Sequence, residues 1–393
     1  MYEPVIVACA RTPVGKANKG SLKNTRPDDL AASVISAAIS RAPGLEGHEI
    51  DDVIIGCAMP EGPQGMNVAR IASLRAGLPV STPAITINRF CASGLQSIAF
   101  AANMIQNGLA KVVIAGGTES MSLVPMGGNN FSPNPHLVDA YPDVYLNMGL
   151  TAENLATKYS ISRDEQDLFA YESHKKSIRA VNNNKFDEEI IPLNLMIDQI
   201  NNKGEKSSYT SVFKKDECPR PDTSITTLKK LTPVFHANGS VTAGNSAQLS
   251  DAAAAVVVTS KEIAIKRGWK VLGRFVNFVT VGVKPEEMGI GPVMAIPKAL
   301  SAAGISKSNI GLIELNEAFA VQSLAVIKKL DLDPHKINVN GGAISLGHPL
   351  GCTGTRLTIT LLHEMKRREI QFGLVTMCVG GGMGVAAVFE HLN

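Results

Sequence analysis

The same order of predicted helices and strands occurs twice along this chain of 393 residues. The first copy comprises helix 27–42, strand 52–56, strand 86–88, a helix led by Cys91 and strand 112–117. The second copy comprises helix 296–303, strand 310–315, strand 337–340, a helix after His348 and strand 373–378. A repeat of about half-domain size that occurs only twice favours two similar α/β lobes over a solenoid of many short units.

The predicted strands are short and continuously apolar, and the helices beside them carry one apolar stripe. After Cys91 the stripe has the spacing i, i+3, i+4, i+7 and i+10 and consists of Leu95, Ile98, Ala99, Ala102 and Ile105. Strands that are apolar on both sides belong to sheets covered by helices on both faces. We therefore expect five layers, αβαβα, with one mixed sheet from each lobe.

The segment from about 122 to 249 interrupts this pattern. It contains several prolines, the pair Gly127-Gly128 and a polar run at 201–208. A helix begins inside it at Ser162, which forms a capping-box sequence with Glu165. The sequence thus predicts three regions, which are a first lobe (1–121 plus 250–272), an inserted lid-like loop domain (122–249) and a second lobe (273–393).

Composition excludes several classes of protein. Hydrophobic residues make up 45% of the chain, enough for a large shared core, and the net charge of +3 gives no global field for nucleic acid. Six cysteines without a CxxC pair argue against a disulfide scaffold or a zinc site and favour reduced thiols in a cytoplasmic compartment. No uncharged apolar run approaches the ~18 residues of a membrane span, so we expect a soluble protein.

Cys91 lies where predicted strand 86–88 turns into a helix. The free N–H groups at a helix N-terminus stabilise a thiolate and can bind a developing oxyanion. The alternative is a small buried residue near a helix start. Position alone does not decide between the two, so the assignment depends on the other motifs.

His348 follows Gly347 in a segment with four nearby glycines, which let the backbone pass close to a ligand. Pro349 comes next, at the helix start, where its missing N–H costs nothing. A neutral imidazole nitrogen can take a proton from a cysteine and later donate it to an oxyanion. A histidine in this setting is therefore a candidate base rather than a packing residue.

Two further candidates lie at the ends of apolar strands. Cys378 leads into the run 380–382, where three glycines remove side-chain bulk and let main-chain N–H groups face a carbonyl. Asn316 follows strand 310–315, and its amide can hold a water or an oxygen without titrating. The alternatives are an inert buried thiol and an N-cap for a helix that begins at Glu317. Three of the remaining cysteines are expected to be structural, namely Cys9, Cys57 and Cys352, and Cys218 is expected to lie in a loop.

Taken together, these motifs resemble the thiolase family over essentially the whole chain. Further blocks that carry the likeness are Arg11-Thr12-Pro13-Val14-Gly15, Gly116-Gly117-Thr118-Glu119-Ser120-Met121-Ser122 and Ser240-Val241-Thr242-Ala243-Gly244-Asn245. The segments 88–96 and 147–150 are most similar to bacterial 3-ketoacyl-CoA thiolases of fatty-acid breakdown. The resemblance implies duplicated thiolase lobes and the cleavage of 3-ketoacyl-CoA by CoA to acetyl-CoA and a shortened acyl-CoA.

The resemblance also implies a role for each matching residue. Cys91 resembles the nucleophile that becomes acylated, and His348 the base that activates it. Cys378 is similar to the acid/base for the α-proton and the incoming thiol. Asn316 resembles the residue that fixes a water, which binds the enolate or thioester oxygen together with the His348 side chain. The main-chain N–H groups of Cys91 and Gly380 would form the oxyanion hole for the acyl-enzyme.

Members of this family hold CoA with the inserted loop domain and carry no permanently bound cofactor or metal. The corresponding positions here are Arg220 on the adenine side, Ser246, Met148 and Phe319. Where relatives place a serine that contacts pantetheine, this chain has Ala247, so Ser246 is the candidate substitute. The resemblance further implies a homodimer or homotetramer and possible association with a hydratase or dehydrogenase.

Three other functions remain open at this point. An acetoacetyl-CoA thiolase that condenses two acetyl-CoA is disfavoured by Asn147, where the short-chain biosynthetic thiolases have histidine. A ketoacyl synthase acting on acyl carrier protein does not need the second thiol, Cys378. A non-catalytic CoA-binding relative would not need Cys91, His348 and Cys378 together.

Overall fold

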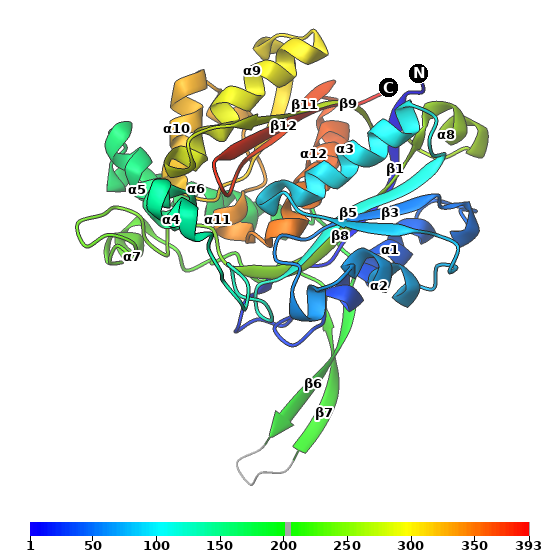
Figure 1. Ribbon diagram of the computed structural model, residues 1–393, viewed down its shortest axis with the longest axis horizontal. Helices are drawn as coiled ribbons and strands as arrows, with labels where there is room; N and C mark the ends of the chain where they lie inside the picture. The colour runs from blue at the N-terminus through cyan, green and yellow to red at the C-terminus, as the bar shows by residue number, and fades with distance from the viewer. Residues whose placement is uncertain (201–205, 393) are drawn as a thin grey trace.

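The first half of the chain builds one mixed sheet from strands that are far apart in sequence (Figure 1). Its strands are β1 (Pro4–Arg11), β2 (Gly15–Lys16), β3 (Asp52–Gly56), β4 (Ala84–Ile87), β5 (Val112–Ser120) and β8 (Ser250–Ser260). Its helices are α1 (Pro27–Ser40), α2 (Val68–Arg75), α3 (Ser93–Gln106) and α8 (Lys261–Arg267). β3 pairs in parallel with β4 and β5, and parallel neighbours require helical crossovers, which α2 and α3 supply.

The second half repeats this arrangement. Its strands are β9 (Gly273–Gly282), β10 (Ile310–Leu315), β11 (Phe372–Val379) and β12 (Met383–Glu390). Its helices are α9 (Gly291–Ala303), α10 (Ala320–Leu330), α11 (Ala343–Leu346) and α12 (Leu350–Arg368). The order β9-β12-β11-β10 matches β1-β8-β5-β3 of the first half, with the same parallel and antiparallel pairs. β1 also pairs with β9 at Val5 and Ile6, so the two expected sheets are joined along this short edge into one ten-stranded sheet. The predicted duplication is therefore confirmed.

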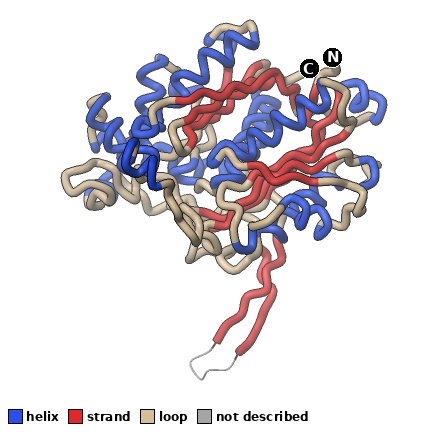
Figure 2. Tube along the Cα trace, in the orientation of Figure 1, coloured by secondary structure: helices blue, strands red, loops and turns tan. Residues whose placement is uncertain are grey.

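The computed structural model describes residues 1–200 and 206–392, and within them the helices and sheets alternate in layers (Figures 1 and 2). α3 and α12 lie between the two sheets and share one apolar core with both. α1 and α2 cover the outer face of the first sheet, while α9 and α10 cover the outer face of the second. The α3 stripe is buried, and each large apolar side chain that leaves water contributes roughly 1.5–3 kcal/mol. These are the five expected layers.

The predicted strand 337–340 is reduced to a single bridge between Ile313 and Ile337. The backbone of Asn338 is left-handed (φ +44°), which an extended strand does not tolerate. Its side chain takes over the pairing, because Oδ1 accepts from Leu315 N (2.9 Å) and Nδ2 donates to Leu315 O (2.8 Å). A side-chain amide thus completes the edge of β10 in place of a strand.

Residues 122–249 leave the first sheet after β5 and return in β8. Their elements are α4 (Pro135–Ala140), α5 (Met148–Lys158), α6 (Arg163–Asn182), β6 (Leu193–Ile200), β7 (Lys206–Phe213) and α7 (Ile225–Lys229). The Ser162–Glu165 capping box starts α6 as predicted. β6 and β7 form an antiparallel hairpin that projects from the body (Figure 1), whereas α5 and α6 pack against α10 of the second half. The insertion therefore bridges the two halves.

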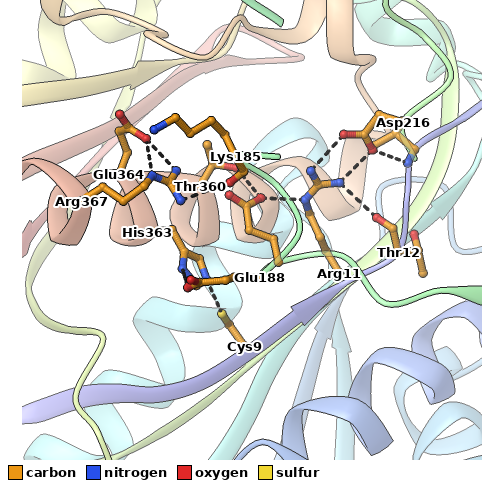
Figure 3. A network of polar contacts seen from close by, with 12 residues as sticks. Cys9, Arg11, Thr12, Lys185, Glu188, Asp216, Thr360, His363, Glu364 and Arg367 are labelled. Carbon is orange, nitrogen blue, oxygen red and sulfur yellow. Dashed lines mark hydrogen bonds and ion pairs between the residues drawn. The ribbon is translucent and has the colours of Figure 1, made fainter. Parts of the chain in front are cut away.

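Arg11 ties both ends of the hairpin to β1 (Figure 3). Its Nε donates to Glu189 Oε2 (2.8 Å), and its Nη1 and Nη2 donate to the Asp216 carboxylate (2.8 and 3.0 Å). All three side chains are buried, and a buried charge is tolerated only when it is paired. Asp216 also accepts from Val14 N (2.8 Å). These bonds hold the segment that leads to Arg220.

Each of the six cysteines is buried and carries a free thiol. Within residues 1–200 and 206–392, every helix is too short or too polar to cross a membrane. The cysteines lie on different elements, so their placement depends on the packing around each one.

Candidate active site

A cavity of about 670 Å³ lies where the first half, the insertion and the second half meet. Cys91, His348 and Cys378 all contribute to its wall. They come from the turn before α3, the loop before α12 and the end of β11, respectively. Much of the remaining wall is apolar, and Lys16 and Arg220 add positive charge. The fold thus brings together three residues that lie far apart in the sequence.

The backbone in front of Cys91 forms a strained elbow. Cys91 lies in the 3₁₀ turn Phe90–Ala92 between β4 and α3, and Phe90 has a left-handed conformation (φ +43°). Such a conformation costs on the order of 1–3 kcal/mol and persists only where neighbours enforce it. Here Asn88 Oδ1 accepts from Phe90 N (2.7 Å), and Ser93 Oγ accepts from Arg89 N (2.8 Å). These side chains hold the elbow that presents Cys91 to the cavity.

The Cys91 thiol is neutral in the free protein. Burial raises its pKa to about 11, although hydrogen bonds from the backbone N–H groups of Gly380 and of Cys91 itself lower it in part. These N–H groups favour the thiolate, as expected beside a helix N-terminus, but desolvation of the buried sulfur outweighs them. The two N–H groups that contact the sulfur are the pair that the sequence predicts as an oxyanion hole.

The His348 ring is held at both nitrogens. Nδ1 lies 2.7 Å from Thr353 Oγ1, and that hydroxyl donates to Pro349 O (2.9 Å). Because the hydroxyl proton is used, Nδ1 must carry the ring proton and Nε2 is left as an acceptor. Burial lowers the His348 pKa to about 3, and the charge of Arg356 adds to this effect. The imidazole is thus neutral, and Nε2, which lies 3.3 Å from Asn316 Nδ2, carries the lone pair that can take a proton.

Asn316 lies directly after β10 and is tied to β11, since its N–H donates to Thr376 O (3.0 Å). Its Nδ2 lies 3.3 Å from His348 Nε2. Helix α10 begins at Ala320 with Phe319 as its N-cap, so the alternative of Asn316 as the N-cap of a helix from Glu317 is wrong. Asn316 Oδ1 is buried and has no hydrogen-bond partner in the part of the chain that the structure describes. This atom is available to a water or to substrate.

Cys378 lies at the end of β11, close to Cys91. Burial and the neighbouring Cys91 raise the Cys378 pKa well above the ordinary thiol value. Gly381 and Gly382 follow with φ +78° and +81°, and a Cβ at 382 would lie 2.5 Å from Val283 O. The turn after Cys378 therefore requires glycine at both positions.

The four predicted CoA-binding residues all line the cavity, namely Met148, Arg220, Ser246 and Phe319. The Phe319 ring packs edge-to-face on Phe235, with centroids 6.2 Å apart. Ser246 Oγ donates to Thr242 O (2.8 Å), so its hydroxyl is already engaged. Ala247 also lies in the wall. The CoA assignments stay predictions.

Two residues of this region escape sequence reasoning. Thr353 lies five residues after His348 on the first turns of α12, and that spacing is its only signal. His174, on α6, accepts from Arg220 N at Nδ1 (3.2 Å). Burial, aided by the charge of Arg220, lowers the His174 pKa to about 4. No local motif links His174 to the distant segment around Arg220.

Comparison with known proteins agrees with this architecture. Residues 4–262 match the thiolase N-terminal domain, and residues 269–391 match the thiolase C-terminal domain. A 3-ketoacyl-CoA thiolase from Bacillus subtilis (strain 168) is 54% identical over 390 residues, which cover 99% of this chain and 100% of that protein.

Two solved structures share the whole fold. The Bacillus anthracis acetyl-CoA acetyltransferase has a TM-score of 0.90 at 42% identity and covers 100% of this chain and 99% of its own. The dimeric peroxisomal thiolase of Saccharomyces cerevisiae has a TM-score of 0.90 at 39% identity and covers 100% and 98%. The thiolase-like duplicated lobes expected from the sequence are thus confirmed, and the chain belongs to the thiolase family.

Proposed function

We propose that this chain is an acyltransferase that cleaves 3-ketoacyl-CoA with CoA to acetyl-CoA and a shortened acyl-CoA, as in fatty-acid β-oxidation. The observation that carries the proposal is the convergence of Cys91, His348 and Cys378 on one largely apolar cavity. A relative with 54% identity bears the name 3-ketoacyl-CoA thiolase, which supports the degradative direction.

In the first half-reaction, His348 Nε2 takes the proton of Cys91 as the sulfur attacks the 3-keto carbon. Both groups are neutral beforehand, so proton transfer accompanies attack. The bond between C2 and C3 then breaks, leaving an acyl-Cys91 and the enolate of acetyl-CoA. The enolate oxygen is stabilised by the protonated His348 and by a water held at Asn316.

In the second half-reaction, Cys378 donates its proton to the enolate carbon, and acetyl-CoA leaves. The resulting Cys378 thiolate deprotonates the thiol of a CoA molecule, whose sulfur attacks the acyl-Cys91 carbonyl. The N–H groups of Cys91 and Gly380 face the oxyanion of this adduct. Its collapse breaks the bond to Cys91, whose thiolate takes back the proton held by His348, and releases the shortened acyl-CoA.

CoA binds as a substrate, without a permanently bound cofactor. Arg220 meets the adenine side, while Met148, Phe319 and Ser246 line the pantetheine path. The enzyme acts in the cytoplasm as a homodimer or homotetramer, alongside a hydratase and a dehydrogenase. Support for an oligomer comes from the dimeric yeast relative.

The test is thiolysis by purified protein with CoA and 3-ketoacyl-CoA substrates of short, medium and long acyl chains. The expected result is cleavage of several chain lengths, absent in Cys91→Ser. Activity confined to acetoacetyl-CoA would support the condensing alternative instead. Absence of thiolysis with every substrate would leave a non-catalytic CoA-binding protein.

A further inference from the structure

Glu119 is a fully buried carboxylate near the end of β5, outside the cavity wall. It accepts four hydrogen bonds from N–H groups, which come from Ala58 N (2.8 Å), Met59 N (3.2 Å), Gly351 N (2.8 Å) and Gln64 Nε2 (2.5 Å). Burial raises its pKa, and these four bonds oppose that rise. The Cys57 thiol is a fifth and weaker partner, with Sγ 3.8 Å from Oε1. The four N–H groups donate two to each oxygen, which is the pattern that an ionised carboxylate accepts.

One branch from Glu119 leads to His348. Oε2 accepts from the N–H of Gly351, in the first turn of α12 and three residues after His348. A Cβ on Gly117 would collide with the Gly351 carbonyl, so this turn is pressed against β5. The negative charge also suits the N-terminus of α12. Glu119 thus fixes the turn from which His348 reaches the cavity.

A second branch leads from the same oxygen to Cys91. Oε2 also accepts from Ala58 N, and Ala58 O accepts from Asn88 Nδ2 (2.9 Å). Asn88 Oδ1 in turn accepts from Phe90 N (2.7 Å), which holds the strained residue in front of Cys91. A single oxygen therefore connects the elbow of Cys91 with the turn of His348.

We propose that Glu119 is a positioning residue, whose Oε2 holds Cys91 and His348 in register for proton transfer. The proposal rests on the proposed function, which assigns that transfer to this pair. Displacing one reacting group by about 1 Å can cost roughly 10²-fold in rate. Since Glu119 is absent from the cavity wall, its effect falls on kcat rather than on substrate binding.

The first variant is Glu119→Gln, which keeps shape but replaces one oxygen with an NH₂ group. In either orientation that NH₂ faces two N–H donors, so the hydrogen bonds on one side of this side chain must break. The expected result is a fall in kcat of about 10- to 100-fold, with KM for both substrates within about 2-fold. If Glu119 served only the stability of the fold, the variant would have a lower melting temperature but no selective fall in kcat at unchanged KM.

The second variant exchanges the two side chains, because Gln64 and Glu119 are direct partners. In Gln64→Glu/Glu119→Gln, the new amide NH₂ donates to position 64, while its oxygen keeps the bonds from Ala58 N and Gly351 N. The exchange loses the bonds of Met59 N and Met59 O, which belong to neither branch. We expect the exchange to recover most of the kcat lost in Glu119→Gln. Gln64→Glu alone places two buried carboxylates side by side and should lose both activity and stability.

The outcomes separate cleanly. A Glu119→Gln enzyme with kcat within about 2-fold of wild type, or a KM that rises in step with the loss of kcat/KM, overturns the proposal. If Glu119→Gln does not fold, the exchanged variant decides: folded and active supports the proposal, and folded but inactive overturns it. If neither variant folds, Glu119 maintains the fold as a whole and the proposal fails. Absence of thiolysis in the wild-type protein would overturn the proposed function and this assignment with it, whereas an active wild type with an unaffected Glu119→Gln variant overturns this assignment alone.

Discussion

Asn316 Nδ2 lies 3.3 Å from His348 Nε2, the nitrogen that the bond from Nδ1 to Thr353 leaves without a proton. Asn316 and Thr353 thus contact the two ring nitrogens of His348 and hold the ring so that the lone pair belongs to Nε2. The neutral imidazole and the neutral thiol of Cys91 form a pair in which the proton moves only when substrate arrives. Orientation of the ring is therefore the property to test first.

Thr353→Val should lower kcat by about 10- to 100-fold, an effect common for residues that orient a functional histidine. Valine has the shape of threonine but leaves His348 Nδ1–H without an acceptor, so the ring can turn or change tautomer. Thr353→Ser keeps the hydroxyl and should stay within about 3-fold of wild type, given the same reasoning. The measurement is steady-state thiolysis by both variants. Equal rates for the valine and serine variants would mean that Thr353 does not orient the ring.

Most of the fold can be predicted from the sequence because the same order of strands and helices occurs in both copies. Apolar strands such as β10 and β11 stand out between amphipathic helices, and their predicted bounds agree with the structure to within a residue. Strand 337–340 fails because the Asn338 side chain replaces backbone pairing with Leu315. That contact joins residues far apart in sequence, and no local pattern reveals it.

The candidate site is predictable where glycines mark close backbone approach, as beside His348 and Cys378. The pKa values are not, because they depend on burial by segments from the other half and from the insertion. The role of Glu119 cannot be predicted from the sequence, because its partners Ala58 and Gly351 come from two segments that are distant from it along the chain. The positions of the site residues are thus easier to predict from the sequence than the burial and the hydrogen-bond partners of their side chains.

Cys91→Ser should lose at least ~10³-fold in activity, because a serine hydroxyl without a matched base is a far weaker nucleophile. All six cysteines are buried, but among the described residues Cys91 and Cys378 are the two that line the cavity. Iodoacetamide should therefore label Cys91 first, since its pKa is raised less than that of Cys378. Peptide mapping after partial inactivation checks this order. Labelling of Cys9 or Cys57 in step with lost activity would refute the assignment.

His174→Asn should remove part of the acid sensitivity of the fold. The folded pKa of His174 is lowered from 6.5 to about 4, so the unfolded chain binds the proton more readily. The stability contributed is complete above pH 6.5 and is lost as pH falls toward about 4, up to roughly 3 kcal/mol. Urea midpoints at neutral and mildly acidic pH should converge in the variant, whose Oδ1 can still accept from Arg220 N. The exposed His136→Asn should keep the wild-type difference, and a similar change in both variants would count against His174.

Arg11→Met should destabilise the protein by about 3–5 kcal/mol, because it leaves Glu189 and Asp216 buried without their cation. The matched control is Arg75→Met, which breaks an ion pair with Asp29 in which both side chains are exposed and should cost about 0–1 kcal/mol. Urea denaturation of both variants measures the difference. Comparable losses would show that the clamp on the hairpin adds nothing beyond a surface ion pair.

Cys378→Ser should separate acylation from turnover. Cleavage of 3-ketoacyl-CoA leaves an enolate that needs a proton at carbon, and no carboxylate is present in the run 379–384 that follows Cys378. His348 is committed to Cys91 and to the oxyanion, which leaves the Cys378 thiol as the donor. Its raised pKa means that the thiol holds its proton until the carbanion forms, and that the thiolate, once made, is a strong base for the incoming CoA.

A serine hydroxyl is a much weaker acid than this thiol. The Cys378→Ser variant should therefore still acylate at Cys91, seen as a mass increase of the intact protein, but turn over poorly. Exchange of the acetyl-CoA methyl protons with solvent deuterium should collapse in the same variant. Near-wild-type exchange and turnover would instead make Cys378 an inert thiol at the end of a strand, and the proton donor would then have to lie elsewhere on the cavity wall.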